Sequence, residues 1–449
     1  MNNYSIIGGG PVGLTLALIL GLNKKHVTLI EREKQLGGTW KMQWVDNEYF
    51  SEHAPRVLHN GLSDNHFFQL LNYLNLNNKK EVAYVYGNIF QCNIKLLKFF
   101  ISYMTINDFI TFLYFSVKYK FVDSRLTVEK WLNKYNISKG GKKALSIMAV
   151  TISDRPDKLK IVDLMGSASG IGAFYQLKNP NKWINHIEKI LKNMPNVTIY
   201  KNCSLVQIKT ESNLVSELVI YNKERHQYKN VSSDRCILAV EPSSLINIIY
   251  NSNFQIKNNW KSFNWIKKWC SESYYIGFGF QLNFKDKIKF PDDWCWSCRG
   301  DWNVIITPIS DWVNVFSRDT KIKTTWSCCI VDMDTKSKRL NKTPNECSKE
   351  EIIDECLYQI NRVYKINPDK ITVTPGLYKK NGVWMSENTA FSRTDMGYIP
   401  MKGKIDNLFY ISSGNDVGMK TVTTIDRSLM SADKYLKKYD KTIKPIVFQ

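Results

Sequence analysis

The feature that most constrains the fold is a glycine-rich turn near the N-terminus. Residues 4–7 form a short apolar run suited to a buried parallel strand, and the next six residues read GGGPVG, a G-x-G-x-x-G spacing. An apolar, Ala- and Leu-rich helix is expected over residues 14–22, and a second strand over residues 26–30. This order of strand, glycine turn, helix and strand predicts a Rossmann-type βαβ unit.

Each part of this unit has a physical role in binding a dinucleotide. Gly8 permits the tight turn, Gly10 lets the backbone approach a pyrophosphate, and Gly13 lets the helix pack close to the strand. The helix N-terminus offers free N–H groups and the positive end of a dipole to phosphates. Glu31 stands 18 residues after Gly13, where an acid that binds a ribose hydroxyl is expected. The predicted contacts are Gly8, Gly10, Pro11, Val12, Gly13 and Glu31.

A second glycine pair follows the acid, in the sequence EREKQLGGTW over residues 31–40. This segment resembles the FAD proteins of the amine oxidase, phytoene desaturase and protoporphyrinogen oxidase superfamily, in which the doublet lets the chain pass close to the cofactor. The resemblance implies FAD, and it implies noncovalent binding because the last ninety residues contain no Cys. It adds Arg32, Gly37, Gly38, Thr39 and Trp40 to the predicted cofactor contacts.

Later segments extend the resemblance over most of the chain. Residues 123–132 are similar to a substrate-domain helix of the superfamily, and residues 197–208 and 236–242 to strands that return to its FAD domain. Residues 407–416 resemble the strand that meets the ribityl chain, and residues 423–429 resemble the helix start beneath the flavin. The contacts implied in these segments are Val206, Gly414, Asn415, Asp416, Thr424 and Ile425.

The chain departs from the superfamily at two of these positions. Asn415 stands where an acid is usual, and Arg427 replaces a Gly. A catalytically decayed, flavin-binding scaffold is therefore one alternative. A flavin-dependent monooxygenase is another, because residues 37–40 also resemble the G-G-x-W of those enzymes, although no second complete G-x-G-x-x-G is present for NADPH.

The resemblance predicts an α/β fold with two interleaved domains. The Rossmann-type FAD-binding domain is assembled from residues 1–75, 190–250 and 385–449. An α+β substrate domain takes residues 76–189 as its helical part and residues 251–384 as its sheet part. The implied reaction is hydride removal from a C–H bond of a small or lipophilic organic substrate to flavin N5, with oxidation of a C–N or C–C bond.

Most catalytic residues stay unassigned from the sequence. The one candidate is Arg56, which follows the family segment beside the flavin and could balance the charge of the pyrophosphate or of the reduced flavin. A surface ion pair is the competing interpretation of Arg56.

The net charge of +21 raises the question of nucleic-acid binding. The Lys residues are spread along the chain, and no Arg-rich arm or zinc-finger spacing occurs, so a solvated basic surface is favoured. Cys295 and Cys298 form a C-x-x-C pair, and Cys328 and Cys329 are adjacent, but no His pair completes a ligand set. We expect structural thiols and no metal.

The sequence also bears on localisation. The first predicted strand begins too early for a secretory leader, which predicts a cytoplasmic protein. Residues 99–117 are strongly apolar, but Asn107 and Asp108 interrupt them centrally, which disfavours a spanning helix. We expect a pair of buried or surface-docking helices there, with possible peripheral membrane contact. The oligomeric state stays open.

Overall fold

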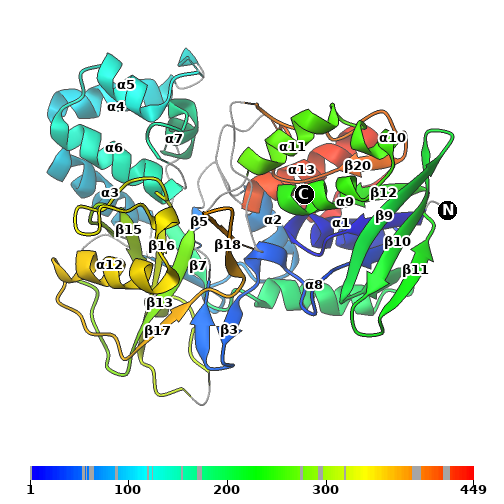
Figure 1. The fold of residues 1–449 in the computed structure, drawn as a ribbon, viewed down its shortest axis with the longest axis horizontal. Coiled ribbons are helices and arrows are strands. Elements are labelled where there is room, and N and C mark those ends of the chain that lie inside the picture. Colours follow the sequence, from blue (N-terminus) through cyan, green and yellow to red (C-terminus); the bar gives the residue numbers. More distant parts are fainter. Residues whose placement is uncertain are drawn as a thin grey trace.

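The computed structural model has two lobes, which lie side by side in Figure 1. It describes residues 3–52, 56, 58–59, 65–85, 89–118, 121–123, 125–152, 155–168, 174–273, 277–291, 297–317, 320–386, 396–417 and 425–448. Thr424 and Cys295, both singled out from the sequence, lie outside the described residues.

The nucleotide lobe is built on a five-stranded parallel sheet of order β20-β12-β1-β2-β8. Its strands are short and mostly buried, as expected for a parallel sheet covered on both faces. They come from distant parts of the chain: β1 (Asn3–Ile7), β2 (His26–Ile30), β8 (Val197–Tyr200), β12 (Arg235–Leu238) and β20 (Leu408–Tyr410).

Alternate residues of this sheet point into two separate cores. Ile6 and Leu29 pack with helices on one face, whereas Ile7 and Ile30 pack on the other. The first face is covered by α1 (Pro11–Leu22), α2 (Asn65–Tyr73), α8 (Lys182–Lys192), α13 (Ile425–Tyr439) and η5 (Ile446–Phe448). The second is covered by an antiparallel sheet of β9 (Cys203–Glu211), β10 (Leu214–Asn222) and β11 (Gln227–Val231), and by α9 (Pro242–Tyr250), α10 (Phe254–Lys257) and α11 (Phe263–Glu272).

The second lobe has a sheet part and a helical part. Its antiparallel sheet has the order β14-β15-β16-β13-β17, and α12 (Lys349–Asn361) packs in its core. The strands are β13 (Phe278–Phe284), β14 (Ser297–Arg299), β15 (Val304–Thr307), β16 (Thr324–Ile330) and β17 (Lys370–Val373). The helices are α3 (Ile89–Tyr103), α4 (Ile106–Val117), α5 (Val128–Lys134), α6 (Lys139–Ile152) and α7 (Ile161–Ala168), at the upper left of Figure 1.

The remaining elements are short. Three minor sheets are β3 (Gln43–Val45) with β4 (Tyr49–Ser51), β5 (Leu58–His59) with β7 (Phe174–Leu177) and β6 (Val82–Tyr84), and β18 (Leu377–Lys380) with β19 (Val383–Ser386). Single turns of 3-10 helix are η1 (Gly38–Trp40), η3 (Ile309–Asp311) and η4 (Pro344–Glu346).

The lobe boundaries in the structure differ from two of the expected domain limits. Helix α8 begins at Lys182, inside the segment assigned to the substrate domain, but Trp183 and Ile187 pack in the nucleotide-lobe core. Helix α11 lies within residues 251–384, yet Trp269 packs beneath the parallel sheet. Both helices carry apolar stripes that are buried by tertiary contacts. The expected domain boundaries were placed from motif spacing, which contains no information on those contacts.

The two apolar helices expected around residues 99–117 are α3 and α4, which are joined by a tight connection at Met104 and Thr105. Thr105 and Asp108 form a capping box that begins α4, which explains the polar residues in an otherwise apolar segment. Among the described residues, no helix combines the length and apolar character needed to cross a bilayer. Cys328 and Cys329 are buried in β16.

Candidate functional site: a nucleotide pocket

A cavity of about 330 Å³ opens at the carboxyl ends of β1, β2 and β12. Ligands of open parallel sheets bind at this edge, where the chain connections run to opposite sides of the sheet. Its lining comes from four stretches of the chain. These are Ile7, Gly8, Gly10, Pro11, Val12, Ile30, Glu31, Arg32, Glu33, Gly38, Thr39, Trp40 and Lys41, then Cys203, Ser204, Leu205 and Val206, then Ala239, Val240, Glu241, Ser244, Asn247, Ile248 and Asn251, and finally Ser412, Ser413 and Ser428.

Two glycines of the first turn are required by packing. Gly8 has φ +104°, and a Cβ there would stand 2.4 Å from the Ala239 carbonyl oxygen. A Cβ on Gly13 would stand 1.8 Å from the Gly8 carbonyl oxygen, because α1 crosses directly against the turn. A side chain at Gly8 would therefore clash with the chain just after β12, and one at Gly13 would push α1 away from the turn, as the sequence motif predicts for the third glycine.

Gly10 has a different role from the other two glycines. A Cβ there would meet nothing closer than the Gly38 Cα at 3.9 Å, so the position faces open space. Gly38 itself has φ +54°, and its own Cβ would stand 3.0 Å from the Gly10 Cα. The two glycine motifs therefore face each other at the N-terminus of α1. A bare backbone on both sides leaves the room that a phosphate group needs.

The N-terminus of α1 supplies the anion-binding groups. Its N-cap is Gly10, no side chain caps it, and Pro11 occupies the first turn. The N–H groups of the next residues have no intrahelical acceptor, and they carry the positive end of the helix dipole. An anion at this point of the cavity would be bound by the helix itself.

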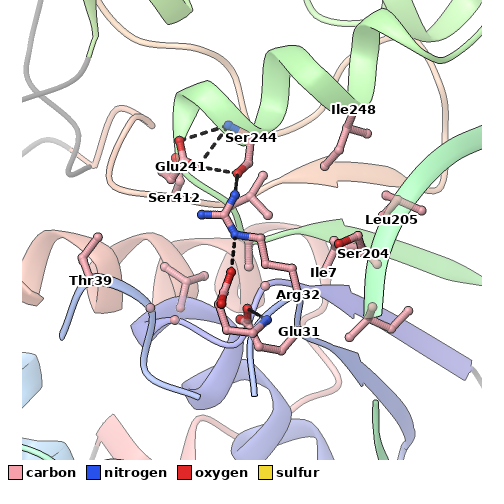
Figure 2. Close-up of a pocket in the computed structure, with 18 of the residues that line it drawn as sticks. Ile7, Glu31, Arg32, Thr39, Ser204, Leu205, Glu241, Ser244, Ile248 and Ser412 are labelled. Atoms are coloured by element: carbon pink, nitrogen blue, oxygen red, sulfur yellow. Dashed lines mark hydrogen bonds and ion pairs between the residues drawn. The ribbon is translucent and has the colours of Figure 1, made fainter. Parts of the chain in front are cut away.

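Glu31 and Arg32 carry opposite charges into the cavity (Figure 2). Glu31 is nearly buried, and its carboxylate accepts hydrogen bonds from the Gly9 N–H at 2.6 Å and the Glu33 N–H at 2.9 Å. These bonds fix the carboxylate between the glycine turn and the end of β2. Arg32 reaches across the cavity, where its Nη1 donates to Ser244 Oγ at 3.0 Å and its Nε lies 3.4 Å from Glu33 Oε1.

One end of the cavity contains lining residues that the sequence reasoning missed. Val206 was expected, but the wall beside it is completed by Ser244 and Asn247 of α9 and by Asn251, the C-cap of that helix. Their spacing of three and four residues places them on one helix face. This polar spacing directly after the Ala239–Pro242 segment was the available signal. In Figure 2, Ile248 and Leu205 add an apolar surface at this end.

The C-terminal segment reaches the cavity through different residues from those expected. Ser412, Ser413 and Ser428 line it, whereas Gly414, Asn415, Asp416 and Ile425 do not. Gly414 is needed for packing, because a Cβ there would stand 2.8 Å from the Trp269 ring. Ile425 is fully buried in the core on the face of the sheet that α1 covers.

Asn415 and Arg427, the two departures from the superfamily pattern, belong to one buried network. Asn415 Oδ1 accepts from the Ser412 N–H at 2.8 Å, and its Nδ2 donates to the Ile399 carbonyl at 3.0 Å. Arg427 donates to the carbonyls of Ser413 at 2.6 Å and Asn415 at 2.8 Å. These bonds hold the loop that carries Ser412 and Ser413. The two departures therefore support each other structurally, which weakens the case for a decayed site.

Arg56 does not line the cavity, but it supports one wall. Its two terminal nitrogens donate to the carbonyls of Trp40 and Lys41, both at 3.1 Å, and its guanidinium lies 5.9 Å from the Trp40 ring centroid. Glu52 is buried nearby, and burial raises the pKa of its carboxyl to about 7 although Arg56 opposes the rise. Burial likewise lowers the pKa of Arg56, and Glu52 opposes that shift.

Comparison with known proteins agrees with this geometry. Residues 6–74 match the family of NAD(P)-binding Rossmann-like domains, which covers the first turn, β2 and the second glycine pair. No curated protein matches the sequence. An oxidoreductase from Methanosarcina mazei has a similar structure, with a TM-score of 0.65 at 11% identity over 97% of this chain and 100% of that chain.

Two amine oxidases are also similar in structure. Putrescine oxidase, in its wild-type form bound to putrescine, has a TM-score of 0.63 at 11% identity over 97% of this chain and 98% of its own. Cyclohexylamine oxidase from Brevibacterium oxydans has a TM-score of 0.58 at 11% identity over 98% of this chain and 99% of its own. The chain has the fold of these oxidases. The structural similarity extends over both lobes. It is therefore not limited to the dinucleotide-binding unit.

Proposed function

We propose that this chain is an oxidoreductase that binds FAD noncovalently and removes hydride from a C–H bond of an organic substrate. The observation that carries the proposal is the cavity that begins at the uncapped N-terminus of α1, between Gly10 and Gly38, and continues to Val206 and α9. A diphosphate fits the first end by charge, and an adenosine fits the second end through its polar and apolar lining.

The donor set of the pocket is consistent with this ligand. Glu31 is held where a ribose hydroxyl is expected after the second strand, and the backbone at Gly10 is open to a pyrophosphate. The second glycine pair favours FAD over a nicotinamide cofactor, since the resemblance of residues 31–40 is to FAD proteins.

FAD, when bound, supplies the acceptor for a hydride. The protein then has to bind, orient and shield the reacting groups. Trp40 lies at the cavity wall next to the second lobe, and Arg56 holds its carbonyl in place. We propose that Arg56 is a positioning residue for this wall.

Amines are the substrate class we propose to test first. Over nearly its whole length, the chain has the fold of two enzymes whose names refer to amines. Desaturation of a lipophilic substrate is the second candidate. It is favoured by the resemblance of residues 31–40 to a superfamily that includes phytoene desaturases.

Replacement of Gly10 by Asp tests the cofactor assignment. The position has extended backbone and free space for a side chain, and Asp is a favourable helix N-cap, so the variant should fold. Its carboxylate would repel the diphosphate, and we expect the affinity for FAD to fall at least about a hundredfold, or about 2.7 kcal/mol. Calorimetric titration of the apoprotein with FAD measures the change.

Ser212→Asp is the matched control. It adds the same charge at an exposed turn of the same lobe, with φ +46°, a conformation that Asp tolerates. FAD binding by this variant should equal that of the parent. Equal affinity in Gly10→Asp and Ser212→Asp, or no uptake of FAD by the parent, would refute the assignment.

Anaerobic bleaching of the flavin identifies the reaction. Amines, amino acids and polyenes would be added in turn to the FAD-loaded protein, and the loss of flavin absorbance followed. Bleaching by an organic substrate alone supports the proposed oxidation. Bleaching only by NADPH would indicate a monooxygenase instead, and an inert flavin across the panel would favour a scaffold.

A further inference from the structure

Large exposed apolar side chains are concentrated on one part of the second lobe. Ile106 is 80% exposed, Val117 77% and Phe90 73%. Ten of the 18 exposed large hydrophobic residues found in the described part of the chain fall between residues 90 and 121. They are Phe90, Ile94, Leu97, Ile101, Ile106, Ile110, Leu113, Tyr114, Val117 and Phe121, which we call the α3–α4 patch.

The spacing of the patch follows the helical repeat. On α3 its members stand at positions 90, 94, 97 and 101, and on α4 at positions 106, 110, 113, 114 and 117, so each set forms a stripe along one helix face. Surface apolar residues scattered singly need no explanation, but contiguous stripes mark interaction sites.

The buried faces of the same helices are apolar as well. Phe100 and Met104 of α3 and Phe112 of α4 belong to the core of the helical part, and the rings of Phe100 and Phe112 lie 5.6 Å apart. The fold therefore already has the apolar surface that it needs from these helices. The second, exposed stripe adds nothing to folding, because it faces solvent.

Charge on these helices has a single sign at the surface. Asp108 is the sole acidic residue between residues 89 and 121, and it is buried as part of the α4 cap. Lys95, Lys98 and Lys118 are basic, and the Lys118 ammonium lies 4.7 Å from the Tyr114 ring centroid. Apolar stripes with basic residues and no exposed acid are typical of helices that lie in the plane of a membrane interface.

We propose that the α3–α4 patch docks this protein on the surface of a membrane rich in anionic phospholipid. The apolar stripes would enter the boundary between headgroups and acyl chains, while Lys95, Lys98 and Lys118 meet the headgroup phosphates. A second copy of the chain fits less well, because it carries the same net charge of +21 and would oppose lysine to lysine. Helices α3 and α4 lie at the opposite end of the molecule from β9–β11 (Figure 1).

Vesicle sedimentation tests the proposal with the full chain. The vesicles are phosphatidylcholine alone, or an equimolar mixture of phosphatidylcholine and phosphatidylglycerol. We expect co-sedimentation with the anionic vesicles, weakened by added salt. The double variant Ile106→Glu/Ile110→Glu should reduce the partition coefficient at least about tenfold, because it places two carboxylates in an anionic interface.

The control is the double variant Tyr228→Glu/Phe254→Glu, which changes two comparably exposed residues of the nucleotide lobe and should bind vesicles like the parent. Circular dichroism checks that both variants fold. This check needs no flavin, so the proposal is tested separately from the proposed function, on which it does not depend. Failure of the parent to sediment, or equal loss in both variants, overturns the proposal. Sedimentation equilibrium tests the alternative of a dimer. The proposal is also overturned if the parent is a dimer that does not bind vesicles and if Ile106→Glu/Ile110→Glu dissociates that dimer.

Discussion

At the scale of single residues, two Asp residues of α13 show how burial and pairing shift the pKa of a carboxyl in opposite directions. Asp426 is buried and accepts a hydrogen bond from the Phe67 N–H at 2.9 Å, and burial raises its pKa to about 6. Asp433 on the same helix is also desolvated, but hydrogen bonds from His66 and Lys437 lower its pKa. Two side chains of the same type therefore make opposite contributions to the pH dependence of stability.

We predict that Asp426→Asn stabilises the protein at neutral pH. The pKa of Asp426 is raised in the folded state, so its contribution is full below its ordinary pKa of 3.8 and is lost as the pH rises to about 6. The amide keeps an acceptor for the Phe67 N–H and has no charge to desolvate. The unfolding free energy of the variant should exceed that of the parent by up to about 3 kcal/mol at pH 7, with little difference near pH 4. Urea unfolding at several pH values measures this.

Asp433→Asn is the control of opposite sign. Its pKa is lowered in the folded state, so the variant should be less stable than the parent at neutral pH, and the difference should disappear as the pH falls below the ordinary value. Parallel curves for the parent and Asp426→Asn would contradict the burial argument.

At the scale of elements, the loop between β20 and α13 is the clearest case of residues that have to be interpreted together. Asn415 was notable from the sequence because an acid is usual there, and Arg427 because a Gly is usual. In the structure Arg427 donates to the Asn415 carbonyl, and the Asn415 side chain bridges Ser412 and Ile399. Both residues thus hold the loop, and they reach the cavity only through Ser412 and Ser413.

We predict that restoring the usual acid, by Asn415→Asp, destabilises the protein. The Nδ2 donor to the Ile399 carbonyl would become a second carboxylate oxygen, which is repelled by that carbonyl inside the core. The expected loss is about 3 kcal/mol in the free energy of unfolding, together with weaker FAD binding because Ser412 lines the cavity. Chemical denaturation and flavin titration measure the two effects.

Asp416→Asn is the neighbouring control, and because Asp416 is exposed it should change stability by less than about 0.5 kcal/mol. If Asn415→Asp proves as stable as the parent and binds FAD more tightly, the residue belongs to the cofactor site, as the sequence comparison suggested.

At the scale of the whole molecule, the pocket ties together segments that are hundreds of residues apart. Gly10, Val206, Asn247 and Ser412 line the same cavity although they lie in four different parts of the chain. A ligand that contacts all of them binds only the assembled lobe. Its binding free energy is therefore added to the stability of the fold.

We predict that FAD raises the unfolding free energy of the apoprotein by about 2.7 kcal/mol at a free concentration one hundred times its dissociation constant. Riboflavin lacks the diphosphate and the adenosine, so it should stabilise far less at the same concentration. NAD⁺ shares both of those groups and is the stricter comparison. Denaturation midpoints with each ligand provide the measurement, and greater stabilisation by NAD⁺ than by FAD would show that the pocket prefers a nicotinamide cofactor.

The sequence by itself determined the parts of this protein that depend on neighbouring residues. The order of residues 4–31 was sufficient for the βαβ unit, because Gly13 is forced by its contact with the Gly8 carbonyl oxygen within the turn, and Gly8 by its own positive φ. The second glycine pair and the position of Val206 at the cavity followed from motifs of the same local kind.

Only the tertiary structure decided which distant side chains reach the cavity. Asn247 and Asn251 line it because α9 folds back over the end of the parallel sheet, and Arg56 misses it because its guanidinium is held by the carbonyls of Trp40 and Lys41. The spacing of Asn247 and Asn251 indicates a shared helix face, but what that face meets depends on the packing of elements that are remote in the sequence.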